Sequence, residues 1–472
     1  MRKLCYKVLS VLAMVLMLVP ATGCSTTEVT GEQNVTENTL QEDVVLSDEE
    51  TREEEQVEGK ATAIRTANYP QMAQYPETDG FTVDEEAYKA WREGKRAQQP
   101  LTDTYKEGIR EFTQKSMQEF LTTSTEDNLV YSPLNVYMAL AMLAELTEGE
   151  SRAQILELLH VESVDALREK VTDLWNANYC EDGTVSSVLA GSVWLNDAIM
   201  YKEEALNTLA ERYYASSYSG TMGSLEYNKL LQDWLNEQTG GLLQEQISQV
   251  EMDPETVLAL ATTVYFRAKW GDKFNKELTT PEVFHMNAAD VTCDFMHESS
   301  AGNYYWGENF AAVIRDLEES GDMMFFLPDE GVSPEELLLD EEVLNFIFDP
   351  NARNNVKRVI INQAIPKFDV TSEFDIVGGL KNMGITDVFA FDTANFTPLT
   401  EETPVMVSSA KHTARVMIDE DGCVATAYTV MLAYGAARPP KDEVDFILNR
   451  PFLFVLNGQD RQPLFVGIVK HP

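Results

Sequence analysis

The side chains that most often bind metals or form covalent intermediates are few in this chain and lie far apart. The five histidines form no HExxH pattern and the five cysteines form no CxxC pair, so the common zinc-ligand signatures are missing from the sequence. It also contains no GxSxG nucleophile elbow and no GxxxxGK[ST] phosphate-binding loop. A catalytic triad assembles in space rather than along the chain, so an enzyme is not excluded. No motif favours one, and we predict no catalytic residue, metal or cofactor.

One segment is unusual for its lack of charge rather than for its reactive groups. No residue from Gly422 to Ala437 is charged, although 24% of the chain is. Read as a strand, the stretch has small side chains on one face and bulkier, β-favouring ones on the other. It predicts a strand whose slim face could enter a closely packed sheet, and an ordinary buried strand would show the same pattern. Exposure of such a segment invites aggregation and would need a functional reason.

The charge balance excludes several classes of partner. Of 472 residues, 78 are Asp or Glu and 36 are Lys or Arg, which gives a formal net charge of −42. Nucleic acids and anionic membrane surfaces require clustered basic residues, and the sequence has no basic run. A hydrophobic fraction of 44% is enough for a large core, and five cysteines are too few for a disulfide-dense scaffold.

The N-terminus has the features of an export signal. A basic start precedes an apolar run from Val8 to Pro20, which is too short to span a bilayer as a helix. Small residues then lead to Cys24, and this resembles the lipobox of bacterial lipoproteins, with Ala21 where Leu is usual. We therefore expect residues 1–23 to be a signal peptide and Cys24 to be lipidated, so that the protein is exported and anchored on the outer side of the cell membrane. A plain cleaved signal with an incidental Cys24 is the alternative.

The rest of the chain divides into a linker and one large domain. Residues 24–104 are acidic and predicted to be partly disordered, although Tyr69, Tyr75 and Trp91 suggest partial docking onto the domain beyond the linker. No linker interrupts residues 105–472, so we expect a single domain there. Helix-period segments come first (109–121 and 138–146), and strand-like runs come after them without regular βαβ alternation, which indicates an α+β fold. The strand-like runs are 257–266, 323–327, 359–361, 405–418, 452–456 and 464–469.

Motifs spread over residues 105–472 resemble the serpin family in order and in spacing. The uncharged segment lies where that family carries its reactive loop, between a strand ending in Asp419-Glu420-Asp421 and the sequence Asn449-Arg450-Pro451-Phe452. The motifs are residues 128–135, 235–241, 262–270, 365–368, 380–387, 407–422, 446–454 and 463–467.

The resemblance implies a fold and an activity. It implies three β-sheets, about nine α-helices and an exposed reactive-centre loop. Most members are suicide inhibitors: a serine protease cleaves the loop, the loop inserts into the central sheet, and the protease is trapped as a covalent acyl complex. The chain would then be no enzyme, and its partner would be a serine protease, with a papain-like cysteine protease as a further candidate. We expect a monomer for which loop–sheet polymerisation is a hazard.

The loop composition favours an inhibitor with a small-residue specificity. By resemblance, insertion starts after Gly422, where side chains must be small or uncharged, and Cys423, Ala425, Thr426 and Ala427 meet that requirement. Val424 and Tyr428 are bulkier than usual but lie on the face expected to look outward. Counting the family's loop length places the reactive bond at Ala436–Ala437, which suits elastase-like or subtilisin-like proteases. Tyr434–Gly435 is the second choice. The hinge residues are Glu420, Gly422, Cys423, Ala425, Thr426 and Ala427.

Further residues match positions where the family's main sheet opens. Ser132, Asn135, Thr262 and His412 would form a polar cluster beneath the moving strands, with Asn135 and Thr262 replacing the usual Ser and Asn. Trp270 matches a tryptophan at the opening end. Ordinary core packing is the alternative for His412 and Trp270. For the whole protein, the alternatives are a non-inhibitory serpin that acts as a surface binding or chaperone-like protein, and an enzyme with an undetected triad.

Overall fold

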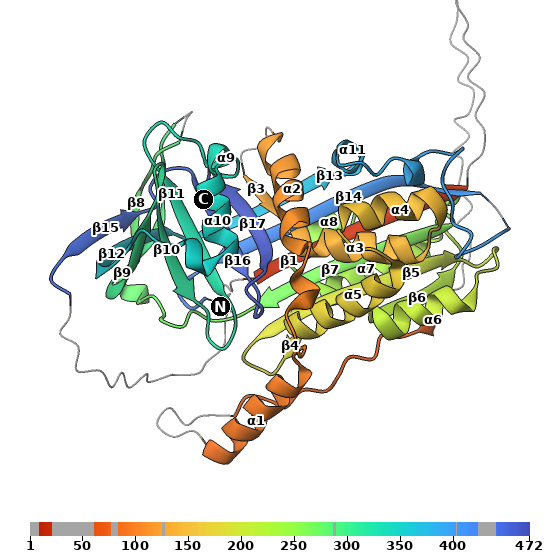
Figure 1. Cartoon of the computed structure of the whole chain (residues 1–472), viewed down its shortest axis with the longest axis horizontal. Helices are drawn as coiled ribbons and strands as arrows, with labels where there is room; N and C mark the ends of the chain where they lie inside the picture. Colours follow the sequence, from red (N-terminus) through yellow and green to blue (C-terminus); the bar gives the residue numbers. More distant parts are fainter. Residues whose placement is uncertain are drawn as a thin grey trace, which may run out of the picture.

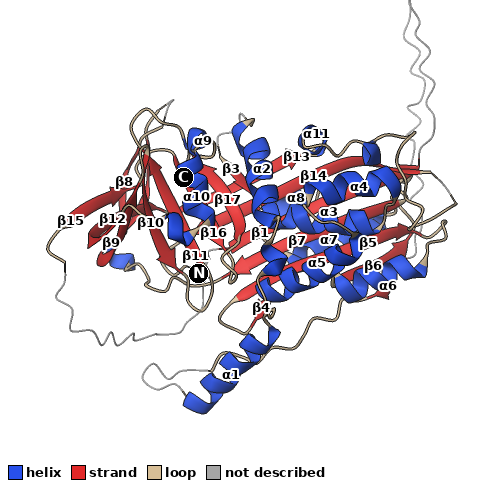
Figure 2. Cartoon of the chain, viewed as in Figure 1, coloured by secondary structure: helices blue, strands red, loops and turns tan. Residues whose placement is uncertain are grey.

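The computed structural model describes residues 9–20 (backbone only), 61–76, 84–124, 128–286, 289–402, 404–422 and 440–472. The strands form two sheets at opposite ends of an elongated molecule, and most helices lie over the larger sheet (Figures 1 and 2). Within the described residues, no helix is both long and apolar enough to cross a bilayer.

The larger sheet has eight strands, and its order is not the order of the chain. β5 and β6 run parallel, whereas the other neighbouring strands are antiparallel. β4 (Cys180–Glu181) pairs with β5 outside the main path. The path is β13 (Phe368–Asp375), β14 (Val405–Ile418), β1 (Leu9–Pro20), β7 (Leu258–Arg267), β5 (Ser186–Asn196), β6 (Ala215–Gly220) and β2 (Ala61–Arg65).

The smaller end of the molecule contains a second, nine-stranded sheet. The prediction of three sheets differs from this result because β9 is a continuous 16-residue strand that pairs with β12 along its length and with β10 at its end. β8 (Thr280–Phe284) pairs with β9 off the path. The path is β15 (Glu443–Ile447), β12 (Val356–Pro366), β9 (Val291–Trp306), β10 (Phe310–Asp316), β11 (Asp322–Pro328), β16 (Phe452–Asn457), β17 (Pro463–Val469) and β3 (Leu129–Tyr131).

The described residues contain eleven α-helices, two more than the nine or so that the resemblance implied, and several of them are very short. Their N-termini are defined by local chemistry: Ser132, Ser163 and Ser224, for example, each accept a backbone hydrogen bond as N-caps. The helices are α1 (Glu85–Gln98), α2 (Ile109–Thr122), α3 (Pro133–Glu145), α4 (Gly149–Leu158), α5 (Val164–Asn178), α6 (Glu203–Arg212), α7 (Leu225–Gln238), α8 (Gln244–Ile247), α9 (Pro334–Leu337), α10 (Glu341–Phe348) and α11 (Val377–Asn382).

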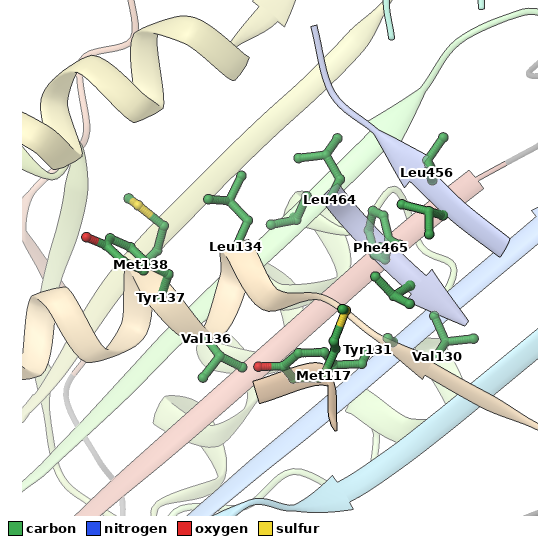
Figure 3. Packing of buried hydrophobic residues seen from close by; sticks show 14 of the residues in the cluster. Met117, Val130, Tyr131, Leu134, Val136, Tyr137, Met138, Leu456, Leu464 and Phe465 are labelled. Atoms are coloured by element: carbon green, nitrogen blue, oxygen red, sulfur yellow. The ribbon is translucent and has the colours of Figure 1, made fainter. Parts of the chain in front are cut away.

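Helix α3 is the centre of the core. Every residue of α3 is buried, as expected for a helix that is apolar on all sides. Figure 3 shows Leu134 of α3 on the side of the helix that faces Leu464 and Phe465 of β17. Buried residues of both sheets belong to this same hydrophobic cluster, so the two sheets share one core. The α+β prediction and the six strand-like runs are confirmed, with the bounds of 405–418 matched by β14.

The N-terminal apolar run is a strand of the larger sheet. Leu9–Pro20, which the sequence predicts to be part of a signal peptide, forms β1 between β7 and β14. Cleavage after residue 23 stays a prediction, and Cys24 lies outside the described residues.

Residues 61–76 and 84–99 are docked onto the domain more extensively than the sequence indicated. β2 pairs with β6, and the Tyr69 ring lies 5.2 Å from that of Trp175. Trp91 of α1 is buried, and its Nε1 donates to Asp182 Oδ2 at 3.1 Å. No helix was expected in this stretch, but α1 has one face that carries Tyr88, Trp91 and Lys95, at the spacing of a helix that packs on a neighbour.

Candidate functional site

The position between β7 and β14 is the most unusual feature of the larger sheet. β1 is antiparallel to both neighbours, so β7 and β14 run in the same direction. Leu9 pairs with Met417 at one end, and Pro20 pairs with Val405 at the other. The sheet therefore accepts a strand from a segment that is far away in sequence, and that strand runs opposite to β14.

A tight turn ends β14 next to this position. The Gly422 amide donates to Asp419 O at 3.2 Å, and Gly422 bridges to Lys269, which comes just after β7. Gly422 has a φ of +83°, and an added Cβ would lie 2.2 Å from the Trp270 amide nitrogen. Only glycine fits both the left-handed backbone and the close approach. The chain thus leaves the turn beside the end of β7.

Glu420 fixes this turn to neighbouring elements. The Glu420 residue is 6% exposed; its carboxylate accepts from Thr279 Oγ1 at 2.8 Å and pairs with Lys367 Nζ at 3.2 Å. Its backbone carbonyl accepts from the Phe274 amide at 3.1 Å. Burial raises the pKa of Glu420, but the backbone hydrogen bond and those from Thr279 and Lys367 outweigh it, and the pKa is lowered overall. The hinge therefore begins with an ionised, fully engaged carboxylate.

Trp270 and Asp419 complete the hinge. Trp270 is 1% exposed, and its Nε1 donates to the backbone carbonyl of Asp419 at 2.8 Å. Burial raises the pKa of the Asp419 side chain to about 7, although the Asp421 amide, which donates to it at 3.0 Å, opposes the shift. Trp270 thus holds the end of β14 through a specific bond, so core packing alone does not describe its contacts.

A buried polar cluster crosses the same sheet position farther along. Thr262 of β7 and His412 of β14 both pair with Met14 of β1, so they lie at the same level on either side of it. Below them, the Ser132 amide donates to His412 Nε2 at 3.2 Å, and Thr262 Oγ1 donates to Asn135 Oδ1 at 3.0 Å. The backbone amide of Asn135 donates to Ser132 Oγ at 3.4 Å, so the His412–Ser132 pair and the Thr262–Asn135 pair are connected. The structure thus brings together all four residues expected in the cluster.

The cluster is neutral and not fully bonded. His412 is completely buried, and burial lowers its pKa from 6.5 to about 3, so its imidazole is uncharged at neutral pH. Among the described residues, neither His412 Nδ1 nor Asn135 Nδ2 has a hydrogen-bond partner. Unused buried donors and acceptors are costly, so this cluster has bonds to gain if the strands above it rearrange.

Comparison with known proteins identifies the family to which this chain belongs. The model of the family described as "Serpin (serine protease inhibitor)" matches residues 107–472. The chain belongs to the serpin family. The family takes its description from serine protease inhibitors.

Named relatives of this serpin agree with the assignment. The chain is 25% identical to alpha-1-antiproteinase 2 of Equus caballus, over 82% of this chain and 92% of that protein. It is 27% identical to the leukocyte elastase inhibitor of Sus scrofa, over 73% of this chain and 93% of that protein.

Solved structures show the same fold. The thermophilic serpin tengpin in its native state is 22% identical to this chain and superposes with a TM-score of 0.68. The match covers 79% of this chain and 96% of that chain. Human thyroxine-binding globulin in complex with thyroxine is 18% identical with a TM-score of 0.65, and the match covers 78% of this chain and 98% of that chain.

Several predicted site residues of this serpin lie outside the described residues. They are the hinge residues Cys423, Ala425, Thr426 and Ala427, the two bonds Ala436–Ala437 and Tyr434–Gly435, and the lipidation site Cys24. Their roles stay predictions.

No group of three metal-binding side chains exists among the described residues. Cys180 is buried, and burial raises its pKa to about 12, while that of Cys293 is raised to about 11 for the same reason. Both thiols are therefore protonated at neutral pH and unsuited to act as nucleophiles.

The sequence did not reveal the partners of the hinge. Lys367 was part of a recognised motif, but its pairing with Glu420, 53 positions away, was not expected. Arg315, whose guanidinium lies 5.4 Å from the Trp270 ring, was also missed, since nothing in its local sequence marks it. The only signal for Lys367 was its place beside the start of the strand that pairs with β14.

Proposed function

We propose that this serpin is a suicide inhibitor of serine endopeptidases that traps its target as a covalent acyl complex. The observation that carries the proposal is the sheet position between β7 and β14, together with the glycine turn that ends β14 beside Lys269 and Trp270, next to that position. A loop that folds back at Gly422 would run antiparallel to β14, which is the direction that β1 takes. The segment from Cys423 to Ala436 is of comparable length to β1.

The chemistry of the proposal belongs to the protease. Its serine attacks the carbonyl carbon of Ala436, the peptide bond to Ala437 breaks, and the Ala437 amine leaves with a proton supplied by the protease's own histidine. The resulting ester links the protease serine to Ala436. Insertion of the loop then carries the protease away and distorts its active site, so that water does not complete the hydrolysis.

We propose an elastase-like or subtilisin-like target. Ala436 has a small side chain that suits a shallow specificity pocket, and one relative is named as an inhibitor of leukocyte elastase. Arg438 would suit a trypsin-like enzyme, but Pro439 comes directly after it and would hinder cleavage there. Tyr434 would suit a chymotrypsin-like enzyme.

The deciding experiment is incubation of the intact protein with elastase, subtilisin, chymotrypsin, trypsin and papain. A band that survives boiling in detergent, at the summed mass of serpin and protease, is expected with elastase or subtilisin. Mass spectrometry of the released peptide then identifies the reactive bond.

The same samples separate the two alternatives. Loop-cleaved protein should unfold at a much higher temperature than intact protein, because insertion adds a strand with neighbours on both sides. Cleavage without an adduct and without this stabilisation would instead support a non-inhibitory serpin, a type of role that thyroxine-binding globulin, with its bound hormone, shows to be compatible with the fold. Catalytic turnover of peptides without an adduct would support an enzyme.

We further propose that the protein is exported and lipid-anchored through Cys24. Removal of residues 1–23 would take β1 out of the sheet and leave its position free for the loop. The wild-type chain should then partition with membranes, and Cys24→Ala should release a processed, soluble form. Recovery of the mature chain with residues 9–20 still attached would contradict this part of the proposal.

A further inference from the structure

A cavity with no assigned role lies where the segment that precedes the serpin domain packs onto it. The cavity has a volume of about 430 Å³, which is in the usual range of small-molecule sites. It is enclosed by Pro70–Ala73, by one side of α1, by Asn176 near the end of α5, and by Tyr214, which comes between α6 and β6. In Figure 1, α1 lies at the lower edge of the molecule, below α5. The cavity therefore depends on the docking of this N-terminal segment.

The lining is nearly free of charge in a very acidic chain. None of the described residues that line the cavity is Asp or Glu, although the chain has 78 of them. Lys95 is the one basic residue among them, and its charge is already engaged. Its Nζ donates to the Glu319 carbonyl at 2.7 Å and lies 3.8 Å from Asp182 Oδ2. Within the described lining, an anion thus finds no free cation and a cation finds no carboxylate.

Three uncharged polar groups of the lining are available to a ligand. The side-chain amides of Gln71 and Asn176 and the hydroxyl of Tyr214 form no hydrogen bond with other described residues. Only the backbone carbonyl of Asn176 is used, and it accepts from Gln98 Nε2 at 3.3 Å. Amides and hydroxyls can both donate and accept hydrogen bonds. A ligand that fits them should offer groups of the same kind, as alcohols do.

Tyr214 gives the cavity an aromatic wall. Its ring stacks on that of Trp175 with 3.8 Å between the ring centres and 20° between the planes, and Trp175 is completely buried. One face of the Tyr214 ring is therefore covered, and the other is left for the cavity. Tyr214 also has a φ of +51°, directly after the C-cap of α6, where glycine is common and a bulky side chain is rare. The ring is thus kept at a position where the backbone disfavours it.

An aromatic face beside uncharged groups that donate and accept suits a sugar. The C–H face of a sugar ring packs on the aromatic ring, and its hydroxyls bond to the amides. We propose that this cavity binds a neutral oligosaccharide, with one sugar ring against Tyr214 and hydroxyl groups bonded to Gln71 and Asn176. A peptide suits the lining less, because its backbone donors and acceptors pair best with a strand edge. Sugar binding at this cavity is independent of the proposed inhibitory function.

The test of binding uses the full chain without protease. Two neutral trisaccharides, triacetylchitotriose and cellotriose, are titrated by calorimetry. Trigalacturonic acid is the anionic comparison, and an alanine tripeptide with blocked ends is the peptide comparison. We expect a neutral trisaccharide to bind with a dissociation constant in the micromolar to low millimolar range, and the two comparison probes to bind at least tenfold more weakly. A preference for triacetylchitotriose indicates an N-acetylated glycan as the source, and a preference for cellotriose indicates a plain glucan.

Three variants locate the site. Gln71→Ala and Asn176→Ala each remove a side chain that has no described bond, so the fold should stay intact. Tyr214→Gly removes the ring and suits the left-handed backbone. Each variant should weaken binding at least fivefold. Asn68→Ala should weaken it less than twofold, and it is the matched control because Asn68 is an exposed amide on the same segment that does not line the cavity.

The outcomes that would overturn the proposal are distinct. Failure of both neutral trisaccharides to bind would overturn the site, as would equal losses in Gln71→Ala and Asn68→Ala. Tighter binding of the acidic trisaccharide or of the tripeptide would overturn a neutral sugar as the ligand. Thermal unfolding without ligand separates loss of the site from loss of the fold. Weaker binding by Gln71→Ala and Asn176→Ala at an unchanged unfolding temperature supports direct contact with the sugar.

Discussion

Two levels of the position between β7 and β14, the hinge end and the middle, are built from opposite chemistry. At the hinge, Glu420 is ionised and bound to Lys367 and Thr279, and Trp270 holds the backbone. At the level of His412, the groups are neutral, completely buried and only partly bonded. The hinge is thus held by a partly exposed ion pair that solvent and salt can weaken, whereas the inner cluster is held by hydrogen bonds that solvent does not reach. Separation of the strands at the hinge should therefore depend on salt, whereas separation at the level of His412 should not.

The largest effect on inhibition should come from blocking loop insertion without changing the contacts of Glu420 or of His412. Ala425→Glu would force a charge into the sheet interior if the loop inserts as proposed. Adduct formation should fall at least tenfold, with the serpin consumed as an ordinary substrate, while native stability stays unchanged. The measurement is the ratio of adduct to cleaved product on a denaturing gel. Val424→Thr, on the face expected to look outward, is the control, and unchanged inhibition by Ala425→Glu would refute insertion.

The inner cluster should dominate native stability. His412→Ala would remove a fully buried ring and leave the Ser132 amide without its acceptor. We expect a loss of about 3–4 kcal/mol from the free energy of unfolding, from the cavity and the lost bond together. His285→Ala, at an exposed pair with Asp290, should change it by less than about 0.5 kcal/mol. Urea unfolding of both variants measures the difference, and equal effects would remove the contrast between surface and interior.

The hinge pair should contribute less. Glu420→Gln keeps a hydrogen bond to Thr279 possible but removes the charge that pairs with Lys367. Because Lys367 is partly exposed, we expect a coupling energy of about 1–2 kcal/mol in a double-mutant cycle with Lys367→Met. This coupling should shrink in 0.5 M NaCl, unlike the effect at His412. A coupling energy that does not change with salt would show that the hinge is as insulated as the cluster.

The free energy of unfolding should depend on pH with opposite signs through His412 and through Asp419. His412 has a pKa of about 3 in the folded state and 6.5 ordinarily, so its contribution is complete above pH 6.5 and is lost as the pH falls below that value. Asp419 has a folded-state pKa of about 7 against 3.8 ordinarily, so its contribution is complete below pH 3.8 and is lost as the pH rises towards 7.

Unfolding free energies between pH 4 and 7 test this pair of signs. His412→Gln should lower the slope of stability with pH, and Asp419→Asn should raise it. If the Asp419→Asn profile is parallel to that of the wild type, the carboxyl does not titrate in this range.

Much of the architecture could be predicted from the sequence because the signals are local or repeated. The β14 strand was bounded correctly since its apolar pattern ends at Ile418, where Asp419-Glu420-Asp421 stops it. The four cluster residues were predicted from motifs of the serpin family, and the structure adds that Asn135 and Thr262 bond directly to each other. With both residues differing from the usual types, only coordinates could give this bond.

The parts that were missed depend on contacts between distant segments. Helix α1 has Tyr88, Trp91 and Lys95 on one face, a visible spacing, but their partners Asp182 and Glu319 lie about 90 and 230 positions away. The joining of two predicted sheets by β9 likewise depends on how far one strand extends, and apolar periodicity says little about that when the exposed face is polar. Arg315 became significant only through the rings it contacts.

The short strand β2 has a consequence for how copies of the molecule meet. An uncovered sheet margin offers free amides and carbonyls to any other chain, and natural proteins often shield such margins. Here Ala61–Arg65 lies along β6 and satisfies that outer row from within the same molecule. β2 is then the outermost strand on this side, and because it is only five residues long another chain would find a short edge there, next to the segment that would connect the body to a lipid at Cys24.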